Sequence, residues 1–256
     1  MHKKNYLTNV EQMLWELIRG KELVDNELVQ QVFPDFSENK RNKLLNSLSA
    51  KGYLQRARRD IYYNPERLND FYALALRIKN GYIGFGSALR RYNLLEYEDF
   101  TIFVATKSYR KKIELKGTKY AIQFVPLSQL FVGFEDRDDI CVSTIEKTFF
   151  DCFLKPRFVG FTNLTKALYD AKLDWHEFVR YFKLTKNNAL CQRTGYILEL
   201  MKTHTKKKIP SFVFAFLQSH ARYPVKLLPM RGHSIFNKRW KVQDNLGEKN
   251  ILSWWL

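Results

Sequence analysis

The feature that most constrains the fold is a series of helix-start signals near the N-terminus. Thr8 and Glu11 have the spacing of a capping box, in which each side chain accepts a backbone N–H of the first helical turn. Asp25 and Ser37 occupy N-cap positions before two further helical segments. Apolar residues follow the first signal at helical spacing, namely Val10, Met13, Leu14, Leu17 and Ile18. The pattern predicts three helices, the last ending at Gly52.

A short arginine-rich turn follows the third helical segment. Residues 51–64 read KGYLQRARRDIYYN, with Arg56, Arg58 and Arg59 between apolar or aromatic flanks. Such flanks predict two short strands joined by a tight turn. Three helices followed by a two-stranded ribbon is the order of a winged helix-turn-helix, whose third helix enters the major groove of DNA. A solvated hairpin with no further role is the alternative.

The faces of the third helix can be assigned because successive residues are rotated by about 100°. Three leucines then face the core: Leu44, Leu45 and Leu48. The opposite face carries asparagine and lysine, with Lys40 at its border: Asn39, Lys40, Asn42, Lys43 and Asn46. Asparagine can bind adenine through two hydrogen bonds, and lysine can bind guanine or phosphate. We therefore expect these five residues to contact bases or backbone, and the three arginines to contact phosphates or the minor groove. A plain solvated face is the alternative.

The remaining residues predict a mixture of helices and strands. Helices are expected over residues 65–81, 143–154, 162–171, 174–182 and 188–202, and a short one from Ser87. Ser143/Glu146 and Asp174/Glu177 have the spacing of capping boxes. Strands are expected over residues 99–106, 119–127, 130–135 and 139–142. The basic segment 107–119 is either a solvated hairpin or a phosphate contact. The expected fold class is α+β: a winged helix-turn-helix at residues 1–64, then a mixed α/β domain at 65–256 with a small antiparallel sheet and helices.

Charge and cysteine usage limit the possible partners and compartment. The formal net charge is +17, which favours nucleic acid first and acidic lipid headgroups second. Residues 200–243 contain no Asp or Glu but include Lys202, Lys206, Lys207, Lys208, Arg222, Lys226, Arg231, Lys238, Arg239 and Lys241. Cys141, Cys152 and Cys191 form no C-x-x-C and are odd in number, which favours buried thiols in a reducing compartment. With neither a secretory signal nor a long apolar run, we expect a cytoplasmic protein that does not contact a membrane.

The sequence contains no convincing catalytic or metal-binding pattern. Glu146 and Lys147 are adjacent in the first turn of an expected helix, so their side chains point about 100° apart and do not converge on a metal. None of the five histidines has zinc-ligand spacing. We therefore expect a protein that is not an enzyme, with no catalytic residues, metal, cofactor or small-molecule substrate.

Two segments resemble a known family. GYIGFGSALRRYNLL at 81–95 and VSTIEKTFFDCFL at 142–154, separated by strands, are similar to the AbiEi family of antitoxins and transcriptional regulators. These belong to type IV toxin–antitoxin systems linked to abortive infection, a form of phage defence. The similarity covers roughly residues 8–200. The family commonly has His-Gly-Leu where this chain has Tyr92, Asn93 and Leu94, so no histidine role carries over.

The resemblance implies a specific function. The winged helix would bind inverted repeats in double-stranded operator DNA and repress its own operon, and the C-terminal domain would neutralise a nucleotidyltransferase-like toxin. Two alternatives remain open at this stage. One is a protein-interaction module whose winged helix does not bind DNA. The other is a general nucleic-acid-binding protein that binds RNA, which the basic C-terminal region favours.

Overall fold

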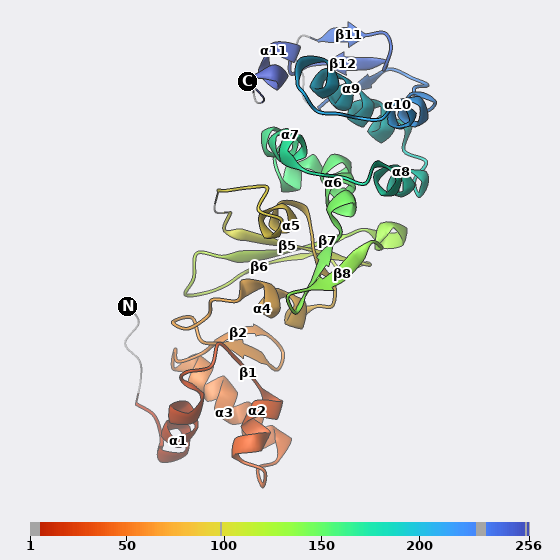
Figure 1. The fold of residues 1–256 in the computed structure, drawn as a ribbon. Coiled ribbons are helices and arrows are strands. Elements are labelled where there is room, and N and C mark those ends of the chain that lie inside the picture. The colour runs from red at the N-terminus through yellow and green to blue at the C-terminus, as the bar shows by residue number, and fades with distance from the viewer. Residues whose placement is uncertain (1–5, 98, 229–233, 254, 256) are drawn as a thin grey trace. The chain divides into compact units, whose positions relative to one another are not determined.

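A computed structural model describes residues 6–97, 99–228, 234–253 and 255. Two compact units emerge (Figure 1). The first comprises Met1–Ile83, Asp99–Ser128 and Asp138–Cys141, and the second comprises Gly84–Glu98, Gln129–Arg137 and Val142–Leu256. The expected boundary after residue 64 falls inside the first unit, and Arg231 lies outside the described residues.

The first unit begins with three helices and three short strands. Its elements are α1 (Asn9–Ile18), β1 (Leu23–Asp25), α2 (Asn26–Val32), α3 (Glu38–Ala50), β2 (Gln55–Arg58) and β3 (Ile61–Tyr63). The strands form an antiparallel sheet in the order β1-β3-β2. The hairpin was predicted, but β1 was not, because three residues carry too little alternation to stand out.

The predicted caps of these three helices are confirmed. The Thr8 N–H donates to Glu11 Oε2 at 2.6 Å, and the Glu11 N–H donates to Thr8 Oγ1 at 3.4 Å. The Asp25 carboxylate accepts the Leu28 N–H at 2.9 Å. Ser37 caps α3 in the same way by accepting a backbone N–H of its first turn.

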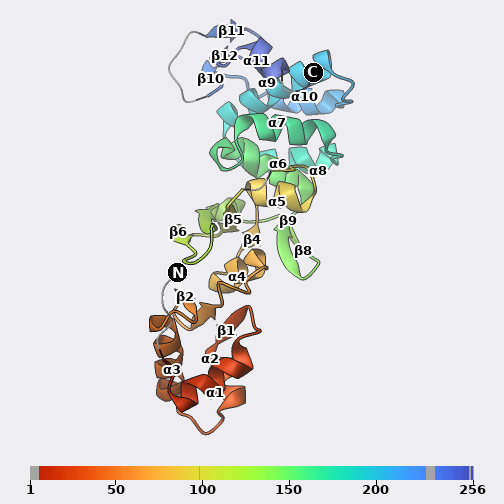
Figure 2. The same cartoon turned by 90° about the vertical axis from the view of Figure 1, so that its left-hand side faces the viewer.

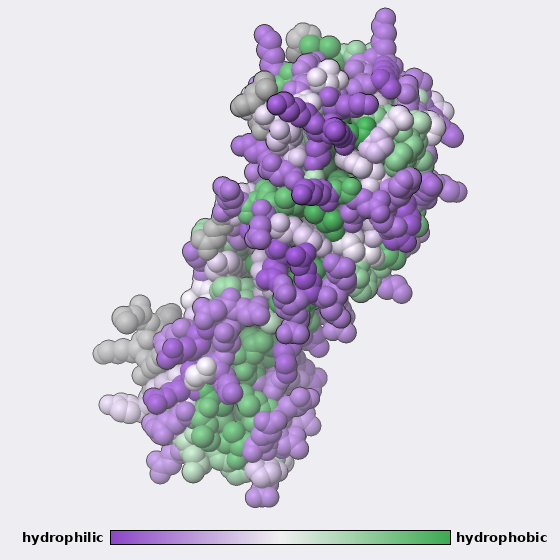
Figure 3. Space-filling view, viewed as in Figure 1, coloured by the Kyte–Doolittle hydropathy of each residue, from purple (hydrophilic) through white to green (hydrophobic). Residues whose placement is uncertain are grey.

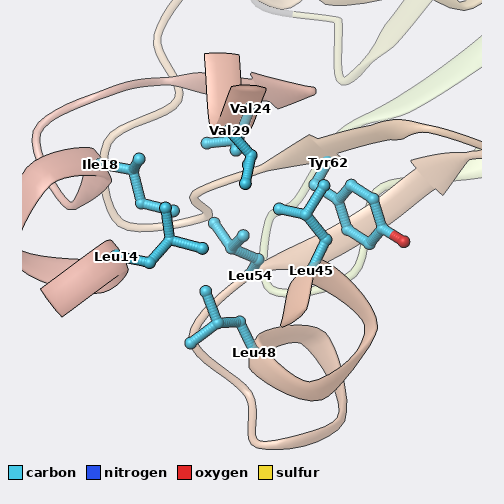
Figure 4. Close-up of a cluster of buried hydrophobic side chains, with 8 residues drawn as sticks. All are labelled: Leu14, Ile18, Val24, Val29, Leu45, Leu48, Leu54 and Tyr62. Carbon is cyan, nitrogen blue, oxygen red and sulfur yellow. The ribbon is translucent and has the colours of Figure 1, made fainter. Parts of the chain in front are cut away.

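A compact apolar cluster holds these elements together (Figure 4). It consists of Leu14, Ile18, Val24, Val29, Leu45, Leu48, Leu54 and Tyr62. The expected inward face of α3 is confirmed, with Leu45 and Leu48 fully buried and Leu44 packed at the margin. The apolar face of α1 is only half covered, however. Met13 and Leu17 are each 59% exposed and Val10 is 38% exposed, so one edge of the apolar face of α1 stays uncovered by the described residues.

The rest of the first unit is a helix and a mixed sheet. Its elements are α4 (Phe71–Ile78), β4 (Tyr82–Ile83), β5 (Thr101–Thr106), β6 (Lys111–Glu114), β7 (Ala121–Pro126) and β9 (Ile140–Ser143), the last straddling the two units. The strand order is β6-β7-β5-β4-β9. The expected small antiparallel sheet is therefore a mixed one, because β5 and β7 are parallel. The basic segment 107–119 contains β6, which pairs antiparallel with β7, so this segment is a hairpin.

Helix α4 begins six residues later than the sequence predicts. Asp70, not Pro65, starts it, and its carboxylate accepts the Ala73 N–H at 2.8 Å. The Glu22 carboxylate accepts the N–H groups of Asn69 and Asp70, each at 2.9 Å. These backbone groups are therefore bound by a distant side chain, which the local pattern could not indicate.

The second unit is mainly helical (Figure 2). Its elements are α5 (Phe85–Arg91), β8 (Phe134–Arg137), α6 (Ile145–Leu154), α7 (Phe161–Asp170), α8 (Trp175–Lys183), α9 (Asn188–His204), α10 (Ser211–Gln218), β10 (Val225–Lys226), β11 (Ile235–Asn237), β12 (Val242–Asp244) and α11 (Glu248–Leu252). Short 3-10 helices cover Ser128–Leu130 and Pro156–Phe158. Helix α6 packs against α5, α7, α8 and α9, and the small sheet has the order β10-β12-β11.

Several predicted starts in this unit shift along the chain. Helix α5 begins after Gly84 rather than at Ser87, and α7 begins after Gly160 rather than at Thr162. Thr144 rather than Ser143 caps α6. The expected strand at 130–135 begins instead at Phe134. Each helix start moves to a nearby residue that serves as its N-cap.

No helix among the described residues combines the length and the apolar character needed to cross a membrane.

Candidate nucleic-acid interface

The outward face of α3 displays most of the predicted contact residues. Asn39, Lys40, Lys43 and Asn46 are exposed. Lys40 Nζ lies 3.5 Å from the centroid of the Phe36 ring, which holds its alkyl chain against the start of the helix. Asn39 and Lys43 have no side-chain partner among the described residues, so both are available to a ligand.

Asn42 has a different environment from the other asparagines of α3. Its Oδ1 accepts Asn26 Nδ2 at 2.6 Å, and Asn26 Oδ1 in turn accepts Arg41 Nε at 2.6 Å. Arg41 is 9% exposed and also donates to the Phe36 carbonyl. This chain of hydrogen bonds fixes α2 against α3. The acceptor oxygen of Asn42 is therefore already occupied within the protein.

Asn46 joins α3 to the hairpin. The Tyr62 hydroxyl of β3 donates to Asn46 Oδ1 at 2.8 Å, while the Tyr62 ring belongs to the apolar cluster. Burial raises the pKa of Tyr62 above its usual value, so the phenol stays protonated as the donor. The hairpin and the outer face of α3 are therefore fixed relative to each other through one buried tyrosine.

The three arginines of the turn occupy three different environments. The side chain of Arg59 is 81% exposed and lies 3.4 Å from Asp60. Arg56 lies over the Tyr62 ring, with its guanidinium carbon 5.8 Å from the centroid. Arg58 donates instead to the carbonyl oxygen of Ile78 at the end of α4. Arg56 also donates through Nε to the Arg58 carbonyl at 3.3 Å. Arg59 is therefore the freest of the three, and Arg58 is bound to a neighbouring element.

The backbone of the turn explains this divergence. The register of β2 and β3 shifts between Arg56 and Arg58, which marks a β-bulge. A bulge changes the direction in which the following side chains point. Asp60 completes the turn with a φ of 62°, a left-handed conformation that aspartate tolerates better than most residues.

The second unit contains a basic pocket that the sequence patterns did not predict. It has a volume of about 480 Å³, and its lining includes Trp175, Lys202, Lys206, Lys207, Lys208 and Pro210. The sequence indicated the lysines through the long stretch without acids. It could not indicate Trp175, which lies 27 residues before the first of them and reaches the pocket only through the packing of α8 beside α10.

The acidic and basic residues considered for catalysis are used within the protein. Lys147 Nζ lies 2.5 Å from Asp151 Oδ1, and both side chains are completely buried. The Glu146 carboxylate does not close a capping box with Ser143. It accepts the Asp174 N–H at 2.9 Å, across from α6 to the start of α8. Within the described ranges, no cluster of three His, Cys, Asp or Glu residues could hold a metal ion.

Residues 84–95 and 142–154 lie in the second unit. Helix α5 packs against α6. The Tyr92 hydroxyl donates to the Ser143 carbonyl at 2.9 Å. Arg137 lies over the Tyr92 ring, with its guanidinium carbon 5.0 Å from the ring centroid. Tyr92 therefore links the end of α5 to the segment that precedes α6.

No protein-family model and no curated protein matches this sequence.

Proposed function

We propose that residues 8–64 form a winged helix-turn-helix that binds operator DNA, and that the protein represses transcription of its own operon. The observation that carries this proposal is one surface built from two elements. Helix α3 exposes Asn39, Lys40 and Lys43, and the turn between β2 and β3 exposes Arg56 and Arg59. The bond between Tyr62 and Asn46 holds these two elements together.

The chemistry of the surface fits the two tasks of a DNA-binding domain. Asn39 and Lys43 can bind the edges of bases, which supplies sequence preference. Lys40, Arg56 and Arg59 can bind phosphates, which positions the domain without reading sequence. If these three cations contact phosphates, log K falls with log salt concentration at a slope of about −3.

A binding experiment tests the repressor function. The full chain is titrated into labelled duplex from the region upstream of its gene, at low and at moderate salt, beside an unrelated duplex. We expect tighter binding to the upstream duplex and a steep salt dependence. The variant Asn39→Ala/Lys43→Ala should lose the preference, while Glu16→Ala, a change at an exposed residue of α1, should keep it. Absence of binding to either duplex at low salt refutes the proposal.

The proposal extends to an antitoxin of a type IV, AbiEi-like system that counteracts a nucleotidyltransferase-like toxin. Its support is the resemblance of segments 81–95 and 142–154, which pack against each other in α5 and α6. Co-expression tests this part. A nucleotidyltransferase-like product of the neighbouring gene should arrest growth alone and should be tolerated with this chain. Growth arrest that persists with the chain present contradicts the antitoxin role.

One observation favours a second candidate, a protein-interaction module. Val10, Met13 and Leu17 form an exposed apolar face on α1, and Figure 3 shows hydrophobic surface over the N-terminal elements. Exposed apolar patches often mark protein contacts. Under this alternative the chain would bind no duplex even at low salt, so the experiment above separates the two functions.

A further inference from the structure

We infer that the second unit carries a separate binding surface for single-stranded nucleic acid along helices α8 and α10. This surface uses none of the residues assigned to the proposed winged helix. It accounts for the excess of positive charge after residue 200, which the proposed repressor surface leaves unused.

Helices α8 and α10 run side by side in the same direction. At their starts, the rings of His176 and Phe212 stack with centroids 4.3 Å apart and an interplanar angle of 14°. At their ends, Lys183 Nζ lies 5.9 Å from the centroid of Phe216. The two helices are therefore parallel. We call the line of contact between them the seam, and it extends over the ~12 Å length of α10.

A basic pocket lies at the start of this seam. Lys202, Lys206 and Lys208 line it and are exposed, while Trp175 is half-buried in its wall. The Trp175 ring is fixed by an edge-on contact with Phe178, at 5.6 Å between centroids. Lys207 supports the wall, because its ammonium donates to the carbonyls of Tyr169 and Ala171 at the end of α7.

A second basic pocket lies at the other end of the seam. It also has a volume of about 480 Å³, and its lining includes Lys183, Lys186, Phe216, His220 and Arg222. No Asp or Glu lines either pocket.

Each pocket combines cations with an aromatic side chain, and this combination selects the ligand. Proteins that bind single strands hold the phosphates with lysine or arginine and stack the bases on aromatic rings. A duplex could use the cations but not the rings, because its bases are already stacked on one another. Six cations line the two pockets and form no ion pair within the described part of the chain: Lys183, Lys186, Lys202, Lys206, Lys208 and Arg222. Full contact with a single strand predicts a salt slope of about −4.

The test measures binding of the full chain to labelled strands of about 12 nucleotides by fluorescence anisotropy. The probes are oligo(U), oligo(dT), an abasic strand with the same number of phosphates, and anionic vesicles that contain phosphatidylserine. We expect both oligonucleotides to bind more tightly than the abasic strand. The ratio between oligo(U) and oligo(dT) shows whether RNA or single-stranded DNA is the preferred source.

Two sets of variants assign the binding to this surface. Lys202→Glu/Lys206→Glu/Lys208→Glu should weaken binding at least about tenfold and flatten the salt slope by about 2. Lys166→Glu/Lys172→Glu/Lys249→Glu makes the same charge change at exposed lysines that line neither pocket and should retain wild-type affinity. Trp175→Leu should lower affinity for oligo(dT) about fivefold or more while leaving the abasic strand unaffected. Circular dichroism confirms that each variant is folded.

Several results would overturn the inference. Equal affinity for the abasic strand and oligo(dT) would remove the stacking role of Trp175. Equal losses in the two lysine triples would mean that net charge alone drives binding. Vesicles that bind as tightly as the strands, with the same dependence on Lys202, Lys206 and Lys208, would assign the surface to a membrane. Asn39→Ala/Lys43→Ala should leave single-strand binding unchanged, so this inference and the proposed operator binding can fail independently.

Discussion

The ammonium of Lys51, at the end of α3, lies 2.6 Å from Oε2 of Glu11 in the first turn of α1. The other carboxylate oxygen of Glu11 accepts the Ser47 hydroxyl at 2.5 Å. The Glu11 side chain also closes the capping box with Thr8, although it is only 4% exposed. One buried carboxylate therefore both caps α1 and holds it against α3, the helix that we propose enters the major groove.

This contact predicts a loss of stability in acid. The hydrogen bonds from Lys51 and then Ser47 lower the pKa of Glu11 from 4.5 to about 2. Because the folded pKa is below the unfolded value, the stabilisation is fully present above about pH 4.5 and disappears as the pH falls towards 2. Glu11→Gln should lower the free energy of unfolding by about 1–3 kcal/mol near neutral pH.

Urea unfolding at several pH values, followed by circular dichroism, measures this effect. The difference between wild type and Glu11→Gln should shrink below about pH 4.5. Glu16→Gln is the matched control, since the Glu16 carboxylate is exposed and accepts the side-chain amide of Gln12 at 2.6 Å. Equal losses in the two variants would show that Glu11 contributes no more than a surface carboxylate.

Substitutions of Arg58 and Arg59 should have different effects, one on stability and the other on DNA binding. Arg59 is 81% exposed, so Arg59→Ala should weaken binding to every duplex and reduce the salt slope by about 1, with stability unchanged. Arg58 donates to the Ile78 carbonyl, so Arg58→Ala should lower the free energy of unfolding by about 1–3 kcal/mol. DNA titrations and urea unfolding of both variants measure the two effects. The reverse pattern would contradict the assignment.

Local signals in the sequence predicted the first three helices well. Thr8, Asp25 and Ser37 each bind a backbone N–H within the next turn, so neighbouring residues alone decide these caps. The start of α6 shows the limit of such signals. Ser143 and Thr144 are adjacent hydroxyls with nearly the same pattern, and the Ser143 hydroxyl is instead 2.6 Å from that of Thr148.

The candidate interface was predictable only where it depends on the geometry of one helix. The exposure of Asn39 and Lys43 follows from rotation about α3. The bond of Asn42 to Asn26 and that of Arg58 to Ile78 join residues 16 and 20 positions apart, and only the folded chain brings them together. The pocket at Trp175 was missed for the same reason.

Gly195 is predicted to tolerate no side chain. A Cβ at this position of α9 would lie 2.1 Å from Cζ3 of Trp240, which is fully buried. The Trp240 indole cannot easily move, since its Nε1 donates to Glu199 Oε2 at 2.7 Å. Gly195→Ala should therefore lower the free energy of unfolding by about 1–3 kcal/mol or more. Thermal unfolding measures this, with Gly20→Ala as the control, because a Cβ at Gly20 meets nothing within 4 Å. Equal melting temperatures for the two variants would contradict the close approach.

The buried pair of Lys147 and Asp151 is predicted to be strongly coupled. Burial lowers the pKa of Lys147, and the Asp151 carboxylate at 2.5 Å opposes this shift. Lys147→Met leaves a buried carboxylate without its ammonium and should lower the free energy of unfolding by about 3–5 kcal/mol. Asp151→Leu should cost a similar amount, whereas the double variant should cost clearly less than the sum, because apolar side chains can replace a buried ion pair. Urea unfolding of the wild type, the two single variants and the double variant completes this double-mutant cycle. Lys166→Met is the control for the loss of one exposed charge. Additive losses would show that the two side chains act independently.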